Sequence, residues 1–230
     1  MPAGYKQFGP VAMAAEVLCT RWTIVLLREF IAGSTRFNDL RRGVPRMSPA
    51  LLSQRLRELE AAGIIERIEA PRTTGGHEYH LTEAGRDLRP VIETIGIWGQ
   101  RWVDTDLSLE NLDPSLLMWD MRPNLNPTPM PTQRSVIEFL YTDLPAAQKH
   151  WWLIVEATGD VDLCSVDPGL DVDLCVTTRL RAMTSIWMGL STVSAEQSDN
   201  NLDLEGDKAL AKNMQTWLDL SPFAEERKRA

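Results

Sequence analysis

The sequence is poor in cysteine and histidine and has no long apolar run. Its 230 residues include three Cys, an odd number too small for a disulfide framework, so a reducing cytoplasm is the expected location. No stretch of about 18 consecutive apolar residues occurs, which excludes a membrane-spanning helix. The start, MPAGYKQFGPVAMAAEVL, lacks the basic segment and apolar run of a secretory signal. The content of 43% hydrophobic and 24% charged residues is that of an ordinary globular protein rather than a disordered or fibrous chain.

Motifs of the common enzyme classes are missing as well. The sequence contains no nucleophile elbow, P-loop or dinucleotide fingerprint. His77 and His80 lie three residues apart on a predicted strand and therefore point to opposite faces, which disfavours a shared metal. Cys164 and Cys175 lie on separate predicted strands that could bring them together, yet two thiols without a third ligand make a poor zinc site. We therefore expect no catalytic site, no metal and no cofactor.

Basic residues are outnumbered overall but concentrated in one segment. The chain carries 24 Lys and Arg against 32 Asp and Glu, a formal net charge of −8. Residues 1–104 nevertheless have a net charge of +2, and residues 105–230 one of −10. Within residues 36–57 there are six Arg and a single acidic residue, Asp39. This asymmetry indicates two parts with different roles, and a basic element that the average conceals.

The first part has the pattern of three helices, a hairpin and a further helix. Apolar spacing and the absence of Pro predict one long helix over residues 11–31, followed by a short helix over 35–42. A third helix is predicted from Ser48, its N-cap, with Pro49 at the first helical position and Gly63 at the end. Two β-like runs, 64–69 and 77–81, flank the turn APRTTGG, and Thr82 caps a helix over 83–104. This order is that of a winged helix-turn-helix domain with an additional C-terminal helix.

The third helix has the two faces that a DNA-recognition helix requires. Leu52, Leu56 and Leu59 recur on one face, which we expect to be buried. The opposite face begins with small residues and then offers Gln54 and Arg57, which suit adenine and guanine in the major groove. Phosphate contacts are expected from the preceding arginines and from the hairpin tip. The expected DNA-binding residues are Arg36, Arg41, Arg42, Arg46, Ser48, Pro49, Ala50, Ser53, Gln54, Arg57, Arg72, Thr73 and Thr74.

Residues 9–104 closely resemble the HxlR-type winged-helix transcriptional regulators of bacteria. The resemblance rests on Arg21-Trp22-Thr23 and on the segments 36–40 (RFNDL), 48–63 and 81–85 (LTEAG). It implies a homodimer that binds a pseudo-palindromic operator, with dimer contacts from the first and last helices of the domain. The candidate interface residues are Leu18, Ile95, Trp98 and Trp102. The alternative for the two tryptophans is packing on the second part of the chain.

One position departs from the redox-sensing members of that family. Those members often carry a Cys directly before Pro-Val at the start of the first helix, where this chain has Gly9 before Pro10 and Val11. Cys19, close to Trp22, is expected to be a small core residue rather than a reactive thiolate. Any sensor is therefore expected elsewhere in the chain.

The second part begins with a Pro-rich linker, residues 105–131, in which a short helix is expected over 114–121. Strands are predicted over residues 136–141, 151–157, 161–166, 172–177 and 202–205, and helices over 179–188 and 208–218. This pattern predicts an α+β domain over 132–230 with a mainly antiparallel sheet.

Tryptophan and methionine are frequent in this domain. From Asp171 onward the sequence resembles the C-terminal half of the sterol carrier protein type 2 fold, because a strand leads into a helix (171–189) and a later strand ends in Gly206-Asp207. The resemblance implies an apolar or lipid-like ligand held between sheet and helices. Aromatic and thioether side chains can line such a cavity or simply fill a core. The candidate pocket residues are Trp119, Trp151, Trp152, Met183, Trp187, Met188 and Trp217.

These patterns predict a bacterial transcriptional regulator rather than an enzyme. An N-terminal winged helix-turn-helix domain, residues 1–104, would bind double-stranded DNA as a homodimer, and a C-terminal carrier-like domain would bind a small apolar effector. The alternative is a lipid-binding carrier whose winged helix serves only as a dimer or protein-interaction module. The face around Gln54 and Arg57 favours DNA, because a protein-binding face should show apolar anchors.

Overall fold

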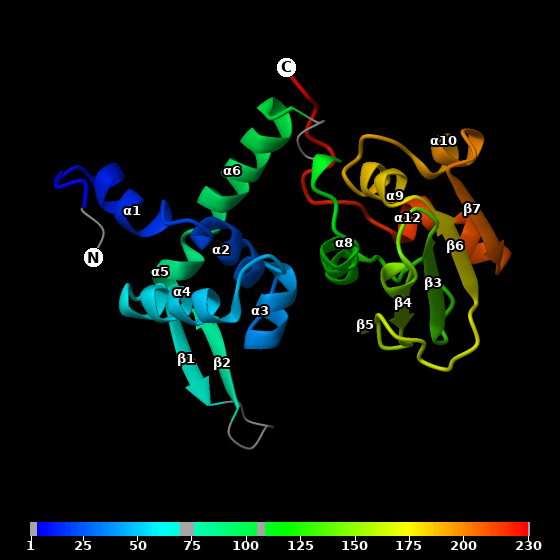
Figure 1. The fold of residues 1–230 in the computed structure, drawn as a ribbon, viewed down its shortest axis with the longest axis horizontal. Helices are drawn as coiled ribbons and strands as arrows, with labels where there is room; N and C mark the ends of the chain where they lie inside the picture. Colours follow the sequence, from blue (N-terminus) through cyan, green and yellow to red (C-terminus); the bar gives the residue numbers. More distant parts are fainter. Residues whose placement is uncertain (1–3, 70–75, 105–108, 230) are drawn as a thin grey trace. The chain divides into compact units, whose positions relative to one another are not determined.

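The computed structural model describes residues 4–69, 76–104 and 109–229 (Figure 1). The predicted wing-tip residues Arg72, Thr73 and Thr74 lie outside this part of the chain. The chain forms two compact units, Met1–Gly96 and Ile97–Ala230, which we describe separately. The division falls within helix α6 (Arg89–Trp102) rather than at residue 104.

The first unit contains a series of helices and one hairpin. Its elements are α1 (Pro10–Leu18), α2 (Thr23–Ile31), α3 (Phe37–Gly43), α4 (Pro49–Ala61), β1 (Ile65–Glu69), β2 (His77–Leu81), α5 (Glu83–Arg86) and the start of α6. The predicted hairpin is confirmed, because β1 and β2 pair antiparallel with Ile65 opposite Leu81. The predicted start of the third helix is also confirmed. The Ser48 hydroxyl accepts a hydrogen bond from the Leu51 amide, and Pro49 occupies the first turn of α4.

The single long helix predicted over residues 11–31 is wrong. The chain is interrupted between Leu18 and Thr23, and the axes of α1 and α2 differ by 84°. Trp22 has a φ of 79°, a left-handed conformation that costs a non-glycine residue about 1–3 kcal/mol. The break contains no Gly or Pro, and the helical spacing of apolar residues continues across it. The sequence therefore gives no sign that the helix is interrupted here. Among the described residues no single helix is long and apolar enough to cross a membrane, and this bent pair meets the length and composition requirements when its two helices are counted together.

Two other predicted helices are divided. The helix expected over residues 83–104 is split between α5 and α6, and the helix expected over 208–218 consists of α11 (Lys208–Lys212) and α12 (Met214–Trp217). The predicted N-cap Thr82 is nevertheless confirmed, and Asp207 caps the start of α11. The Thr82 side chain accepts the Gly85 amide, and the Asp207 carboxylate accepts the amides of Ala209 and Leu210.

The core of the first unit is built on the apolar face of α4. Leu52, Leu56 and Leu59 are each at most 2% exposed, and full burial of such a side chain contributes about 1.5–3 kcal/mol. They belong to a cluster drawn from the surrounding elements, which also contains Leu26, Leu27, Phe30, Leu40, Val44, Met47, Ile65 and Ile92. The predicted buried face of the third helix is therefore confirmed.

A tight turn fastens the hairpin to α5. The Thr82 hydroxyl donates to the Gly63 carbonyl at 2.6 Å, and the Thr82 amide donates to the Ile64 carbonyl at 3.0 Å. Gly85 is buried at this turn, and a Cβ added to it would lie 2.1 Å from the Ile64 carbonyl oxygen. Because the close neighbour is backbone, a larger residue cannot be accommodated by a change of rotamer.

Gly85→Ala is expected to lower the free energy of unfolding by about 1–3 kcal/mol, the usual cost of overpacking. The control is Gly99→Ala in α6, where an added Cβ meets nothing within 4 Å. That change should be neutral or stabilising by up to about 1 kcal/mol, because alanine favours helices. Urea unfolding of the full chain measures both variants, and an equal effect of the two would contradict this account of the turn.

The second unit is built on a five-stranded sheet with the order β5-β4-β3-β6-β7. The strands are β3 (Ser135–Tyr141), β4 (His150–Val155), β5 (Val161–Cys164), β6 (Leu174–Thr178) and β7 (Leu202–Gly206). The remaining elements are α8 (Pro114–Met121), η1 (Arg122–Asn124), η2 (Ala146–Gln148), α9 (Leu180–Trp187), α10 (Val193–Ser198), α11 and α12. The helix predicted over 114–121 is thus confirmed, and α10 was not predicted.

The sheet is mixed, with one parallel pair at its centre. β3 and β6 are parallel, with Ile137 opposite Leu174, whereas the other three neighbouring pairs are antiparallel. Strand β5 lies at one edge of the sheet. After it, residues 165–173 lead to the other side of β3, where β6 pairs parallel with β3. Just before β6 begins, the Asp173 carboxylate accepts a hydrogen bond from the Val136 amide at 2.8 Å. The likeness to the sterol carrier fold stays a prediction.

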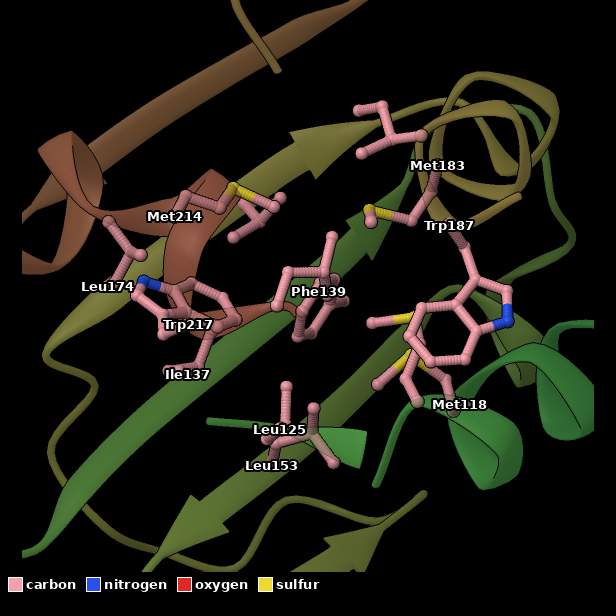
Figure 2. Packing of buried hydrophobic residues seen from close by; sticks show 14 of the residues in the cluster. Met118, Leu125, Ile137, Phe139, Leu153, Leu174, Met183, Trp187, Met214 and Trp217 are labelled. Atoms are coloured by element: carbon pink, nitrogen blue, oxygen red, sulfur yellow. The ribbon is translucent and has the colours of Figure 1, made fainter. Parts of the chain in front are cut away.

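Side chains from the helices and from one face of the sheet form the core of the second unit (Figure 2). Alternation along β3 places Ile137, Phe139 and Tyr141 on this face, and all three are fully buried. Figure 2 shows Phe139 between Trp217 of α12 and Trp187 of α9. The helices therefore cover the sheet through large aromatic and thioether side chains.

Candidate nucleic-acid interface

Helix α4 presents a polar face opposite its buried leucines. Ala50, Gln54 and Arg57 are exposed on this face, and Ser53 is half-buried beside it. The Gln54 amide donates to the Glu58 carboxylate at 2.8 Å, one turn further along the helix. The side chains that sequence analysis assigned to base contacts are thus brought together on one exposed surface.

Arginines surround the start of α4. Arg41 and Arg42 are exposed in the last turn of α3, and Arg46 is exposed in the connection to α4. Arg42 pairs with Asp39 at 3.5 Å, an exposed contact that is weak in water. With Ser48 and Pro49, which are also exposed, they form a basic rim around the polar face of α4.

Arg36 differs from these residues because the hairpin holds it. Its guanidinium donates to the Glu78 carboxylate of β2 at 3.1 Å, and the backbones of the two residues form an isolated β-bridge. His80 lies 3.3 Å from the same carboxylate. The hydrogen bonds from Arg36 and His80 hold the pKa of Glu78 below its usual range. Arg36 therefore fastens α3 to the hairpin and is only partly available to another anion.

Arg55 has a structural role, which a count of arginines in the sequence does not reveal. Its side chain is only 12% exposed and forms an ion pair with Glu58 on the same helix. Its Nε donates to the Arg21 carbonyl at 3.0 Å, at the bend between α1 and α2. Arg55 thus ties α4 to the residue that precedes the strained Trp22 backbone. Helical phase beside the leucine face is the sequence signal that distinguishes it from Arg57.

The pKa of Glu58 reflects the same network. Desolvation acts to raise this pKa, but the hydrogen bonds from Gln54 and Arg55, together with the charges of Arg55 and Arg57, outweigh it and lower the pKa. Glu58 is thus ionised over the neutral range, and it offsets part of the positive charge on α4.

The four candidate dimer residues are wholly or partly exposed. Trp98 is 61% exposed, Trp102 47% and Ile95 40%, all on α6, and Leu18 on α1 is half-buried. Helix α1 has no buried residue at all, and Phe8 and Val11 at its start are 96% and 84% exposed. These two helices therefore carry unpartnered apolar surface.

The candidate pocket residues lie mainly in the packed core of the second unit. Trp151, Met183, Trp187 and Trp217 belong to the buried cluster, and Met188 packs against it. Trp119 is also buried, with the Arg122 guanidinium 4.1 Å from its ring centroid. Trp152 lies on the opposite face of β4 and stacks on His150 at 5.9 Å. The structure thus gathers part of the set into a core and places Trp152 apart from it.

The cysteines are placed differently from expectation. Cys19 is exposed at the end of α1, so the prediction of a small core residue is wrong, because the break before α2 removes it from the helical face that leads into the core. Cys164 and Cys175 lie on β5 and β6 with β4 and β3 between them, a separation of about 14 Å by strand spacing. Burial raises the pKa of the Cys175 thiol. Among the described residues no group of three or more His, Cys, Asp and Glu side chains is arranged to hold a metal ion.

Helices α2, α3 and α4, followed by the hairpin, define the first unit as a winged helix-turn-helix domain. Residues 17–107 match the HxlR-like helix-turn-helix family, and the chain belongs to this family through its N-terminal part.

Relatives include two uncharacterised HTH-type transcriptional regulators of Bacillus subtilis. YvaP is 35% identical over 91 residues, covering 40% of this chain and 84% of YvaP. YdeP is 37% identical over 101 residues, covering 44% of this chain and 79% of YdeP. Among solved structures, the redox regulator HypR in its reduced form is 37% identical, with a TM-score of 0.38 over 40% of this chain and 91% of HypR.

Arg55→Met is expected to lower the free energy of unfolding by about 1–3 kcal/mol, because it removes the hydrogen bond to the Arg21 carbonyl and the ion pair with Glu58. Arg57→Met, two residues away on the exposed face, should stay within about 0.5 kcal/mol of the unsubstituted protein. Urea unfolding of the full chain measures both. If the two variants were equally stable, Arg55 would not have the structural role described above.

The effect of Arg55→Met should also depend on pH. The pKa of Glu58 is lowered from 4.5 by folding, so the ion pair contributes fully above that value and its contribution is lost as the pH falls through the folded pKa. The stability difference between the two proteins should therefore narrow in acid. It should not vanish, because the bond to the Arg21 carbonyl does not titrate.

Proposed function

We propose that this chain is a DNA-binding transcriptional regulator of HxlR type, which binds a pseudo-palindromic operator as a homodimer in the bacterial cytoplasm. The observation that carries the proposal is the exposed face of α4, where Ala50, Gln54 and Arg57 lie opposite a fully buried leucine face. A small residue at the start of a recognition helix permits close approach to the major groove. Gln and Arg make bidentate contacts with adenine and guanine there.

The basic rim supports the same proposal. Arg41, Arg42 and Arg46 surround the N-terminal end of α4, where phosphate contacts would fix the register of the helix on the duplex. Arg36 would contribute less, since Glu78 already accepts its hydrogen bond. The wing tip, with Arg72, Thr73 and Thr74, is a further proposed contact. Binding through such contacts should weaken steeply as salt increases.

The composition of the α4 face opposes the alternative of a protein-interaction module. Protein interfaces are anchored by buried aromatic and aliphatic side chains, whereas the exposed residues of this face are small or polar. The apolar effector predicted for the second unit is not part of the proposal, because most of the candidate pocket residues pack against one another in its core.

Arg57→Ala is expected to weaken operator binding by about 1–3 kcal/mol and to relax base preference at one position. Fluorescence anisotropy of the full chain on DNA from upstream of its own operon, at several salt concentrations, measures both effects. Arg134→Ala is the matched control, because Arg134 is an exposed arginine of the second unit. A protein that forms no salt-sensitive, sequence-selective complex would contradict the proposal.

The homodimer is proposed from the apolar surface of α1 and α6. Exposed apolar area of this kind marks interaction surfaces in soluble proteins, and two-fold dimers are the commonest assemblies. A second copy would bury Phe8, Val11 and Trp98, which are otherwise 96%, 84% and 61% exposed. Two recognition helices related by a two-fold axis would then match the two halves of a palindromic site.

Trp98→Glu is expected to raise the dimer dissociation constant by about tenfold or more, since buried tryptophans are frequent anchors of interfaces. Sedimentation equilibrium of the full chain measures it, and the unsubstituted protein should sediment as a dimer. Val166→Glu is the control, because Val166 is an isolated apolar residue that is 77% exposed in the second unit. A dimer unaffected by Trp98→Glu would show that Trp98 lies outside the interface.

A further inference from the structure

A polar hollow lies at the end of the sheet where the parallel strands β3 and β6 terminate. Its volume is about 460 Å³, within the range of about 300–1,000 Å³ that is typical of small-molecule sites. Its walls come from the residue after β3, from the end of β6 and the residue after it, from the end of α10 and the loop after it, and from the start of β7. In sheets with parallel strands, the carboxyl ends of those strands are where ligands usually bind.

Two opposite charges flank this hollow. β6 continues without a turn through Arg179, the N-cap of α9, whose backbone is extended (φ −93°, ψ 146°). Alternation therefore places Arg179 on the same side as Thr177, while Thr178 between them is buried. Asp203 of β7 is the cross-strand partner of Thr177. Arg179 and Asp203 thus occupy diagonal positions of neighbouring strands, where Cα atoms are about 7–8 Å apart.

Four of the polar side chains that line the hollow are exposed to solvent. Within the described part of the chain, the side chains of Arg179, Gln197, Asn200 and Asp203 form no hydrogen bond or ion pair, and Arg179 and Asp203 do not pair with each other. The backbone around them is held firmly. The Thr178 hydroxyl donates to the Asn201 carbonyl at 3.0 Å, and the Thr142 amide donates to the Thr178 carbonyl at 2.9 Å.

The lining residues exclude several classes of ligand. Among the described residues Leu202 is the one apolar lining residue, and it is buried, so an acyl chain would find no apolar wall. None of the lining residues that the structure describes has an aromatic ring that could stack on a sugar or a base. Asp203 would repel a simple anion, and Arg179 would repel a simple cation. The start of α9 is already occupied, because the Asp143 carboxylate accepts the Leu180 amide at 3.0 Å.

We propose that this hollow binds a small zwitterion of the α-amino acid type. The ligand carboxylate would accept hydrogen bonds from Arg179, and its ammonium group would donate to Asp203. The amides of Gln197 and Asn200 would bind a polar side chain of the ligand. This site belongs to the second unit, and it does not depend on how the first unit binds DNA.

Isothermal titration of the full chain with each standard L-amino acid tests the proposal. At least one should bind saturably, and Arg179→Gln and Asp203→Asn should each weaken it by about tenfold or more, as expected for a lost charge-assisted hydrogen bond. Arg134→Gln is the control, because Arg134 precedes β3 at the opposite end of that strand. The N-acetylated form of the same amino acid, which lacks the ammonium group, should bind more weakly and should not be weakened further by Asp203→Asn.

The proposal is overturned if no amino acid binds, or if binding is unchanged in both variants. Thermal unfolding of each variant shows whether it is folded. If a variant is not folded, the unsubstituted protein still decides, because equal affinity for the free and the N-acetylated amino acid would overturn the proposal. Operator binding is measured separately and without amino acids, so failure of one proposal is distinguishable from failure of the other.

Discussion

Burial of the leucine face of α4 is the constraint on which the first unit depends. Leu52, Leu56 and Leu59 fill the centre of its core, and helical periodicity then determines which residues of α4 face water. Gln54 and Arg57 fall on the exposed side, whereas Arg55 falls beside the core and reaches the Arg21 carbonyl. The same packing that stabilises the domain thus also orients its polar face.

Features with a local cause were predictable from the sequence. The caps at Ser48, Thr82 and Asp207 each involve a side chain and an amide two or three residues away, so the helix starts follow from short-range chemistry. The break at Trp22 was not predictable, because no Gly or Pro marks it and its strain is maintained by contacts with distant residues such as Arg55. The parallel pairing of β3 and β6 likewise depends on where residues 165–173 cross, which strand patterns do not encode.

The candidate site was predicted in outline for a similar reason. Counting arginines located the basic segment, but charge alone treats every guanidinium as equivalent. The structure separates them: Arg55 is mostly buried and bonded to the Arg21 carbonyl, Arg36 is held by Glu78 42 residues away, and Arg57 is exposed beside Gln54. In the second unit, composition indicated many Trp and Met residues, yet composition does not distinguish a lined cavity from a filled core. Its hollow is lined by polar residues at strand ends, which carry no comparable signal in the sequence.

Net charge is a poor guide to the partner of a chain built in this way. The total is −8, and the whole acidic excess lies beyond residue 104. At physiological ionic strength, charges are screened over about 8 Å, so a phosphate beside α4 would respond mainly to Arg41, Arg42, Arg46 and Arg57. Glu58 lies within that distance of Arg57 on the same helix and reduces the local field, whereas any acidic residue more than a screening length away contributes little. The few charges nearest the duplex, and the partners that hold them, therefore matter more for binding than the sum over the chain.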